Sequence, residues 1–198
     1  MQTIQTPRIQ PVDVGFTPIP TRIKDTPPLV VDTTESESKK AVVSHLGDLA
    51  QRLAQIHRTA AEGYLSQGMY SEALPHLEAA VTFAKGNAEY QNQLGFVRYI
   101  CGNDQGAVGS FQRALELQPA NPDGWFNLGM VQYGQGRFAE AEDSFRISTE
   151  HAPNNPETWN NRGVALHRLG RINDARICFQ RALQIDPSNA DAKANLAS

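Results

Sequence analysis

The feature that most constrains this chain is a stretch of 34 residues, 122–155, that is followed at once by a second copy of itself, 156–189. A fixed period of this length is typical of a repeat array, in which each unit is too small to bury its own apolar face and stacks on its neighbours. Six of the positions at which the two copies agree define a grid: Trp125 and Trp159, Gly129 and Gly163, Gly136 and Gly170, Ala141 and Ala175, Phe145 and Phe179, and Pro153 and Pro187.

The same grid extends towards the N-terminus with weaker matches. Residues 54–87 form a unit in which His57 stands where the grid has Trp and Lys85 where it has Pro. Residues 190–198 are expected to be the first helical turns of a fifth unit. Residues 88–121 form a unit that keeps Leu94, Gly95, Gly102, Ala107, Phe111, Ala114 and Pro119.

Each column of the grid has a physical reason. Gly129 is small where two helices must approach closely, Gly136 suits a positive φ at a helix end, and Pro153 stops the second helix of its unit. Two apolar or small faces recur at helical spacing, and in the unit 122–155 they consist of Trp125, Leu128 and Gln132, and of Ala141, Phe145 and Ser148.

The order W-x2-L-G, then A-x3-F, then a final Pro resembles the tetratricopeptide repeat (TPR) family. The resemblance covers about 145 of the 198 residues. It implies an all-α fold, a right-handed superhelix of antiparallel helix pairs. Two arginines depart from the pattern, because Arg162 replaces a buried Leu and Arg98 a Tyr. Each is expected to reach solvent or pair with a carboxylate, since an unpaired buried charge is costly.

The segment before the repeats falls into two parts. Residues 1–33 hold six of the twelve prolines, which predicts extended chain, disordered when unbound. The segment is also rich in apolar residues, so it either docks, on its own array or on another molecule, or remains a solvated tail.

Residues 34–53 are predicted to be helical, starting at the capping-box pattern Thr34 to Glu37. The helix runs on to about residue 67, or is two helices joined at Gly47 and Asp48. Its apolar stripe is either a cap on the open end of the array or a dimerisation seam, because the spacing is heptad-like. The stripe consists of Val42, Leu46, Leu49, Leu53, Ile56, Ala60 and Tyr64.

Composition limits which locations and classes of partner are expected for this chain. The net charge is −3 and 40% of the residues are hydrophobic, and no run approaches the roughly 18 apolar residues of a membrane span. Without a signal or transit pattern, a cytoplasmic location is the expectation. The chain has no stripe of Lys and Arg residues that could neutralise phosphates, so nucleic acid is not expected as a partner. Cys101 and Cys178 lack disulfide or metal spacing and are expected to be buried free thiols.

The family resemblance also implies where a partner would bind, because the first helix of each TPR unit lines the concave side of the superhelix. The sixth position of successive units holds Gln93, Asn127, Asn161 and Asn195, an amide ladder similar to that of O-linked N-acetylglucosamine transferases, which grips peptide backbone. The alternative is that these amides are solvated or bonded within the helices. The residues expected to contact a peptide are Gln93, Phe96, Tyr99, Phe126, Asn127, Met130, Tyr133, Asn160, Asn161, His167 and Arg168.

These features favour a non-catalytic scaffold or adaptor that binds an extended peptide segment of a partner protein. The carboxylate clamp of chaperone-binding TPR proteins is missing, because Phe96 and Glu157 stand at two of its positions. The alternatives are a specialised chaperone or assembly factor for a client protein, and a structural protein that self-assembles through its N-terminal tail or its open end, with the helix 34–53 or the chain ends as possible contacts between copies. No catalytic motif is present, the five histidines are scattered, and no metal or cofactor is expected.

Overall fold

A computed structural model describes residues 33–197, with side chains from residue 36 onwards. The chain divides into two units, Met1–Ala41 and Val42–Ser198. The extended proline-rich segment was expected to span residues 1–33, and all of it except Thr33, which begins α1, lies outside the described residues. The side chains of the predicted capping box lie partly outside them as well, although the helix itself starts there, at Thr33.

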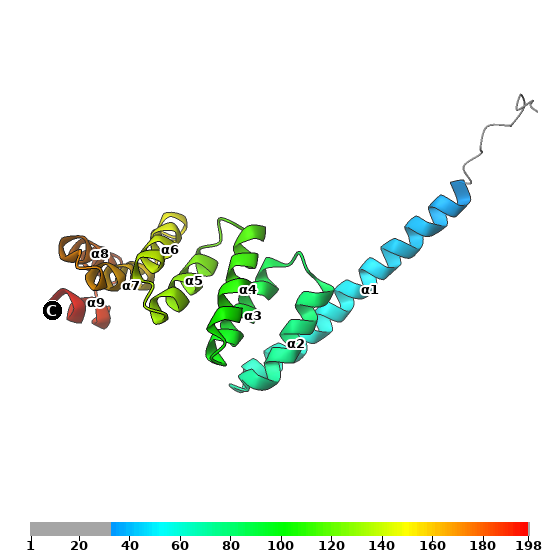
Figure 1. Cartoon of the computed structure of the whole chain (residues 1–198), viewed down its shortest axis with the longest axis horizontal. Coiled ribbons are helices and arrows are strands. Elements are labelled where there is room, and N and C mark those ends of the chain that lie inside the picture. The colour runs from blue at the N-terminus through cyan, green and yellow to red at the C-terminus, as the bar shows by residue number, and fades with distance from the viewer. Residues whose placement is uncertain (1–32, 198) are drawn as a thin grey trace, which may run out of the picture. The chain divides into compact units, whose positions relative to one another are not determined.

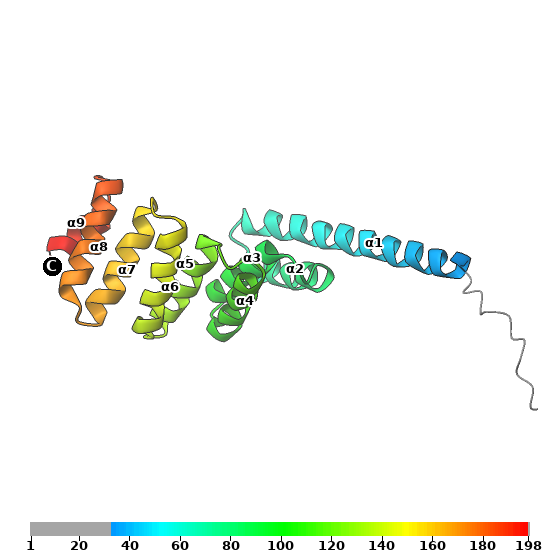
Figure 2. The same ribbon diagram turned by 90° about the horizontal axis from the view of Figure 1, so that it is seen from above.

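The described residues form nine helices and no strand, so the predicted all-α fold is confirmed. Helices α2 to α9 follow one another as antiparallel neighbours (Figures 1 and 2). Helix α1 is continuous through Gly47 and Asp48, which settles the choice between one helix and two. The elements are α1 Thr33–Leu65, α2 Tyr70–Phe83, α3 Ala88–Ile100, α4 Asp104–Leu117, α5 Pro122–Gly134, α6 Phe138–His151, α7 Pro156–Arg168, α8 Ile172–Ile185 and α9 Ala190–Ala197.

The two helices of a unit meet where the grid has glycine. A Cβ atom built on Gly129 would lie 2.7 Å from Cε1 of Phe145, a ring that is 1% exposed. Gly163 and Phe179 repeat this contact at 2.5 Å. Phe145 also packs with Phe126 of its own unit and Ala165 of the next. The Gly and Phe columns are therefore two sides of one contact that allows the helices to cross closely.

The Trp and Pro columns are also connected. The indole Nε1 of Trp125 donates to the carbonyl oxygen of Pro119 at 2.7 Å, and Trp159 donates to Pro153 at 2.9 Å. Each bond fastens the start of one unit to the end of the unit before it. The unit at 54–87 lacks Trp, and there His57 faces His76 with their Nδ1 atoms 3.2 Å apart and stacks on Phe83.

The ends of the helices follow local rules. The glycine after each first helix has positive φ, at Gly68, Gly102, Gly136 and Gly170. An asparagine side chain caps α3, α5 and α7 by accepting from a first-turn N–H group. Proline stands at the first position of α5 and α7, where its missing N–H group costs nothing.

The two unusual arginines find carboxylates, as expected. Arg162 Nε donates to Oε1 of Glu142 at 2.8 Å, and Arg98 Nη2 donates to Oε1 of Glu78 at 2.9 Å. Arg98 also donates to the hydroxyl of Ser110 at 3.0 Å. Both are ion pairs between helices, so the departures from the repeat pattern add polar links to the array.

The prediction for the cysteines is half wrong. Cys178 is buried in α8, and burial raises the pKa of its thiol. Cys101 is exposed, because it follows the last turn of α3. Within residues 33–197, no helix combines the length and apolar character that crossing a bilayer requires.

Candidate functional site

The first helices of successive units stand side by side and are here called the leading helices: residues 54–65 of α1, then α3, α5, α7 and α9. Contacts link α3 with α5 and α7 with α9 directly, past the second helix of each unit. All eleven predicted site residues lie on α3, α5 and α7. The structure therefore collects them on neighbouring elements of one row.

Hydrogen bonds connect each leading helix to the next at a sequence offset of 35, one more than the period of the repeat. The hydroxyl of Tyr90 donates to Oε1 of Gln55 at 3.2 Å. Nδ2 of Asn127 donates to Oδ1 of Asn92 at 3.3 Å, and Nε of Arg168 donates to the hydroxyl of Tyr133 at 3.1 Å. These bonds hold the leading helices in register, so the surface that they form is largely fixed before any partner arrives.

The amide ladder is partly used within the protein. Besides the bond of Asn127, Nδ2 of Asn161 approaches the sulfur of Met130 at 3.6 Å. Nδ2 of Asn195 donates to Oδ1 of Asn160 at 2.9 Å. Asn127 and Asn161 are half-buried, and a primary amide offers two donors and an acceptor, so each of these two retains capacity for a ligand.

Two other predicted amides, those of Asn160 and Gln93, are less accessible to a ligand. Asn160 is 6% exposed and its oxygen is engaged by α9, so it links helices and has little surface for a ligand. Gln93 is half-buried, and its Oε1 is buried with no hydrogen-bond partner among the described residues. The sixth position of the repeat is therefore not equivalent from unit to unit.

The predicted apolar and aromatic residues divide into an exposed group and a half-buried group. Phe96 is 42% exposed and Ile100 47% exposed, both on α3. Phe126, Met130 and Tyr133 are half-buried and pack against the cluster of Ala141, Phe145 and Ala165. Tyr99 is also half-buried and packs on the cluster that contains Phe111 and Leu128. An apolar side chain of a partner therefore has most to gain at Phe96 and Ile100.

A pocket of about 310 Å³ lies at the C-terminal end of the row. It is lined by Val164, His167, Arg168, Phe179 and Asn195. The predicted residues His167 and Arg168 are both exposed. A volume of this size accepts one side chain of a peptide, and its rim of guanidinium, imidazole and amide groups favours a hydrogen-bond acceptor.

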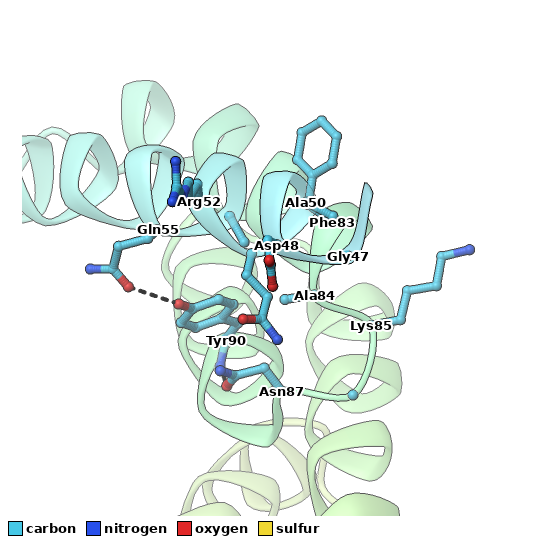
Figure 3. A pocket seen from close by; sticks show the side chains of 13 residues that line it. Gly47, Asp48, Ala50, Arg52, Gln55, Phe83, Ala84, Lys85, Asn87 and Tyr90 are labelled. Atoms are coloured by element: carbon cyan, nitrogen blue, oxygen red, sulfur yellow. Dashed lines mark hydrogen bonds between the residues drawn. The ribbon is translucent and has the colours of Figure 1, made fainter. Parts of the chain in front are cut away.

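A larger pocket, of about 910 Å³, lies where the sequence predicts no site. Gly47, Ala50 and Ala54 of α1 form one wall, and the α2–α3 loop forms the other. Figure 3 shows Tyr90 on its floor, bonded to Gln55, and Lys85 directed away from it. No sequence motif marks this pocket, because its lining comes from two segments that are distant in sequence, α1 and the residues around the α2–α3 loop.

Within the described part of the chain, no group of three or more His, Cys, Asp or Glu side chains is arranged to hold a metal ion.

Comparisons with known proteins agree with the helix pairs. A family profile described as a tetratricopeptide repeat matches residues 126–190, and one described as a TPR repeat matches residues 97–136. No curated protein matches the chain. Among solved structures, the chain resembles YrrB, described as a TPR protein with an unusual peptide-binding site, with a TM-score of 0.68 and 23% identity over 80% of this chain and 87% of that one.

Two further structures are similar. MamA from Desulfovibrio magneticus RS-1 has a TM-score of 0.69 and 22% identity over 73% of this chain and 81% of its own. The first TPR of Spaghetti (RPAP3), bound to the HSP90 peptide SRMEEVD, has a TM-score of 0.54 and 21% identity over 56% of this chain and 87% of its own. At these identities the likeness concerns the fold alone.

The period of 34 residues, the paired helices and the family matches lead to one conclusion. This chain is a tetratricopeptide repeat protein.

Proposed function

We propose that this protein is a non-catalytic scaffold whose leading helices hold an extended peptide segment of a partner protein. The observation that carries the proposal is the exposure of Phe96 and Ile100 on α3, in the same row of helices as the half-buried amides Asn127 and Asn161. Apolar side chains of a peptide would pack on Phe96 and Ile100, and its backbone would form hydrogen bonds with the amides of Asn127 and Asn161.

The size of the row sets the length of the partner segment. Packed helices lie roughly 8–10 Å apart, and an extended chain rises about 3.3 Å per residue, so five leading helices span a segment of about ten residues. Two similar structures support a peptide as the ligand class, since YrrB is described as having a peptide-binding site and the Spaghetti repeat as holding an HSP90 peptide.

The test is a selection from a displayed library of random peptides of about twelve residues, followed by affinity measurements on purified protein by fluorescence polarisation. The binding variant is Phe96→Ala/Ile100→Ala. The control is Ile172→Ala/Ile177→Ala, which removes two exposed apolar residues from α8, the second helix of its unit. All four positions are surface-exposed, so both variants should fold.

We expect the α3 variant to bind a selected peptide at least about tenfold more weakly, which corresponds to about 1.4 kcal/mol. The α8 variant should bind like the wild type. The proposal is contradicted if the library yields no binder, or if the recovered peptides lose affinity through α8 and not through α3.

A further inference from the structure

Helix α1 extends well beyond the repeat array. It has 33 residues, whereas its pairing helix α2 has 14. The first residue of α1 that is buried is Ala54, which packs with Ala80 and Tyr90. Every residue from 42 to 49 is exposed. Residues 42–53 are here called the overhang. Its residues 42–49 have no covering element, and Ala50 and Leu53 towards its end are half-buried.

The overhang is apolar along one side. Val42 is 59% exposed, Leu46 58% and Leu49 47%, and Ile56 continues the line at 63%. Large apolar side chains exposed together in this way mark an interaction surface and not an ordinary solvated helix.

The spacing of these residues indicates what covers them. The steps from Val42 to Leu46, Leu49, Leu53 and Ile56 are 4, 3, 4 and 3 residues, an average of 3.5, which is the period at which one helix packs along another. An extended peptide has a period of 2 and does not match such a stripe. The occupant is therefore a helix with a similar stripe of similar length.

We propose that two copies of this chain associate through their overhangs, packed antiparallel. In this arrangement Val42 packs against Leu53 of the partner subunit and Leu46 packs against Leu49 of the partner subunit, and the two-fold axis repeats both contacts. The segment from Val42 to Leu53 of each chain is thereby covered by the same segment of the other, as a two-fold symmetric interface requires.

The antiparallel direction follows from the residues beside the stripe. Val43 is the most exposed large apolar residue of α1, at 68%. Antiparallel pairing places it next to Ala50 of the partner subunit, so the apolar surface widens on that side. Parallel pairing would place it next to Ser38 of the partner subunit, leaving a valine against a hydroxyl. The other flank carries His45 and Arg52, both exposed, as the polar rim of the interface.

The direction also agrees with the position of the repeats. The array begins immediately after the overhang, at Ala54. An antiparallel pair places the two arrays at opposite ends of the seam, whereas a parallel pair would bring them together at the same end. The paired residues Val42, Leu46, Leu49 and Leu53 include none of the α3, α5 and α7 residues proposed to contact the peptide.

The test is the molar mass of the full chain by sedimentation equilibrium at concentrations up to about 100 µM. We expect a dimer for the wild type and at least a tenfold weaker association for Leu46→Glu/Leu49→Glu. The matched control, Ser44→Glu/Gln51→Glu, adds the same charge on the opposite side of the overhang and should remain dimeric. Circular dichroism checks that the helical content of both variants is unchanged.

A monomeric wild type overturns the proposal, whether the stripe is then covered by a different protein or by residues 1–32 of the same chain. A dimer that survives Leu46→Glu/Leu49→Glu overturns it too. Direction is read from disulfide formation in a Cys101→Ser background, which removes the exposed thiol. A mixture of Leu46→Cys and Leu49→Cys chains should crosslink to each other, whereas crosslinking of each variant only to itself would refute the antiparallel arrangement.

Discussion

At the scale of single residues, the helix pairs depend on the glycine at which two helices cross. The ring of Phe145 occupies the place of a Cβ atom on Gly129. We expect Gly129→Ala to lower the free energy of unfolding by about 1–3 kcal/mol, because a buried ring must move. Urea denaturation followed by circular dichroism measures the change.

Gly109 provides the control, because it is also helical, in α4, and a Cβ there would meet nothing within 4 Å apart from its chain neighbours and the adjacent backbone of its own helix. Gly109→Ala should raise the free energy of unfolding by about 0.5–1 kcal/mol, since alanine favours the helix. Equal changes in the two variants would show that helix propensity, and not the contact with Phe145, decides the result.

Cys178 makes stability depend on alkaline pH. Burial, more than its charged neighbours, raises the pKa of this thiol above its ordinary value of 9.0. The folded state therefore prefers the neutral thiol, and this contribution to stability is present below about pH 9 and is lost as the pH rises through the raised pKa.

Between about pH 8 and about pH 10, the wild type should lose more stability than Cys178→Ala does. Cys101→Ala serves as the control, because it removes an exposed thiol and leaves the buried thiol of Cys178 in place. Urea midpoints at the two pH values provide the measurement, and parallel losses in wild type and Cys178→Ala would refute the assignment.

At the scale of the helices, the boundaries between units depend on asparagine caps. Oδ1 of Asn155 accepts from the N–H groups of Glu157 and Thr158 at the start of α7. Asn155→Ala should lower the free energy of unfolding by about 1 kcal/mol, because a first-turn donor loses its partner. Its exposed neighbour Asn154 is the control, and Asn154→Ala should change stability by less than about 0.5 kcal/mol. Similar losses would mean that the cap contributes nothing specific.

The sequence predicted the helix pairs because each grid residue acts within its own unit or on the next. Gly129 meets Phe145 within one unit, and Trp125 meets the carbonyl of Pro119 just across a boundary. The asparagines at 87, 121 and 155 were an unused signal, since each ends a repeat unit and caps the following helix. The choice between one long α1 and two helices required coordinates, because Gly47 and Asp48 are compatible with both.

At the scale of the whole molecule, less of the site was predictable. A family position fixes the helix that carries a residue, but not how much of its side chain a neighbouring helix covers. Asn160 illustrates this, because α9 brings Asn195 onto its amide oxygen. Phe126 and Met130 were expected to be ligand contacts, and they also pack on Phe145. Whether any of the eleven predicted residues contacts a peptide stays a prediction.

The most direct measurement of the central claim, that the leading helices hold the partner, is photo-crosslinking with a selected peptide. A benzophenone amino acid is placed at Ile100, on α3, or at Ile177, on α8; both positions are exposed, at 47% and 62%. Our account predicts that the peptide is crosslinked from position 100 and not from position 177. Crosslinking from position 177 alone would contradict it.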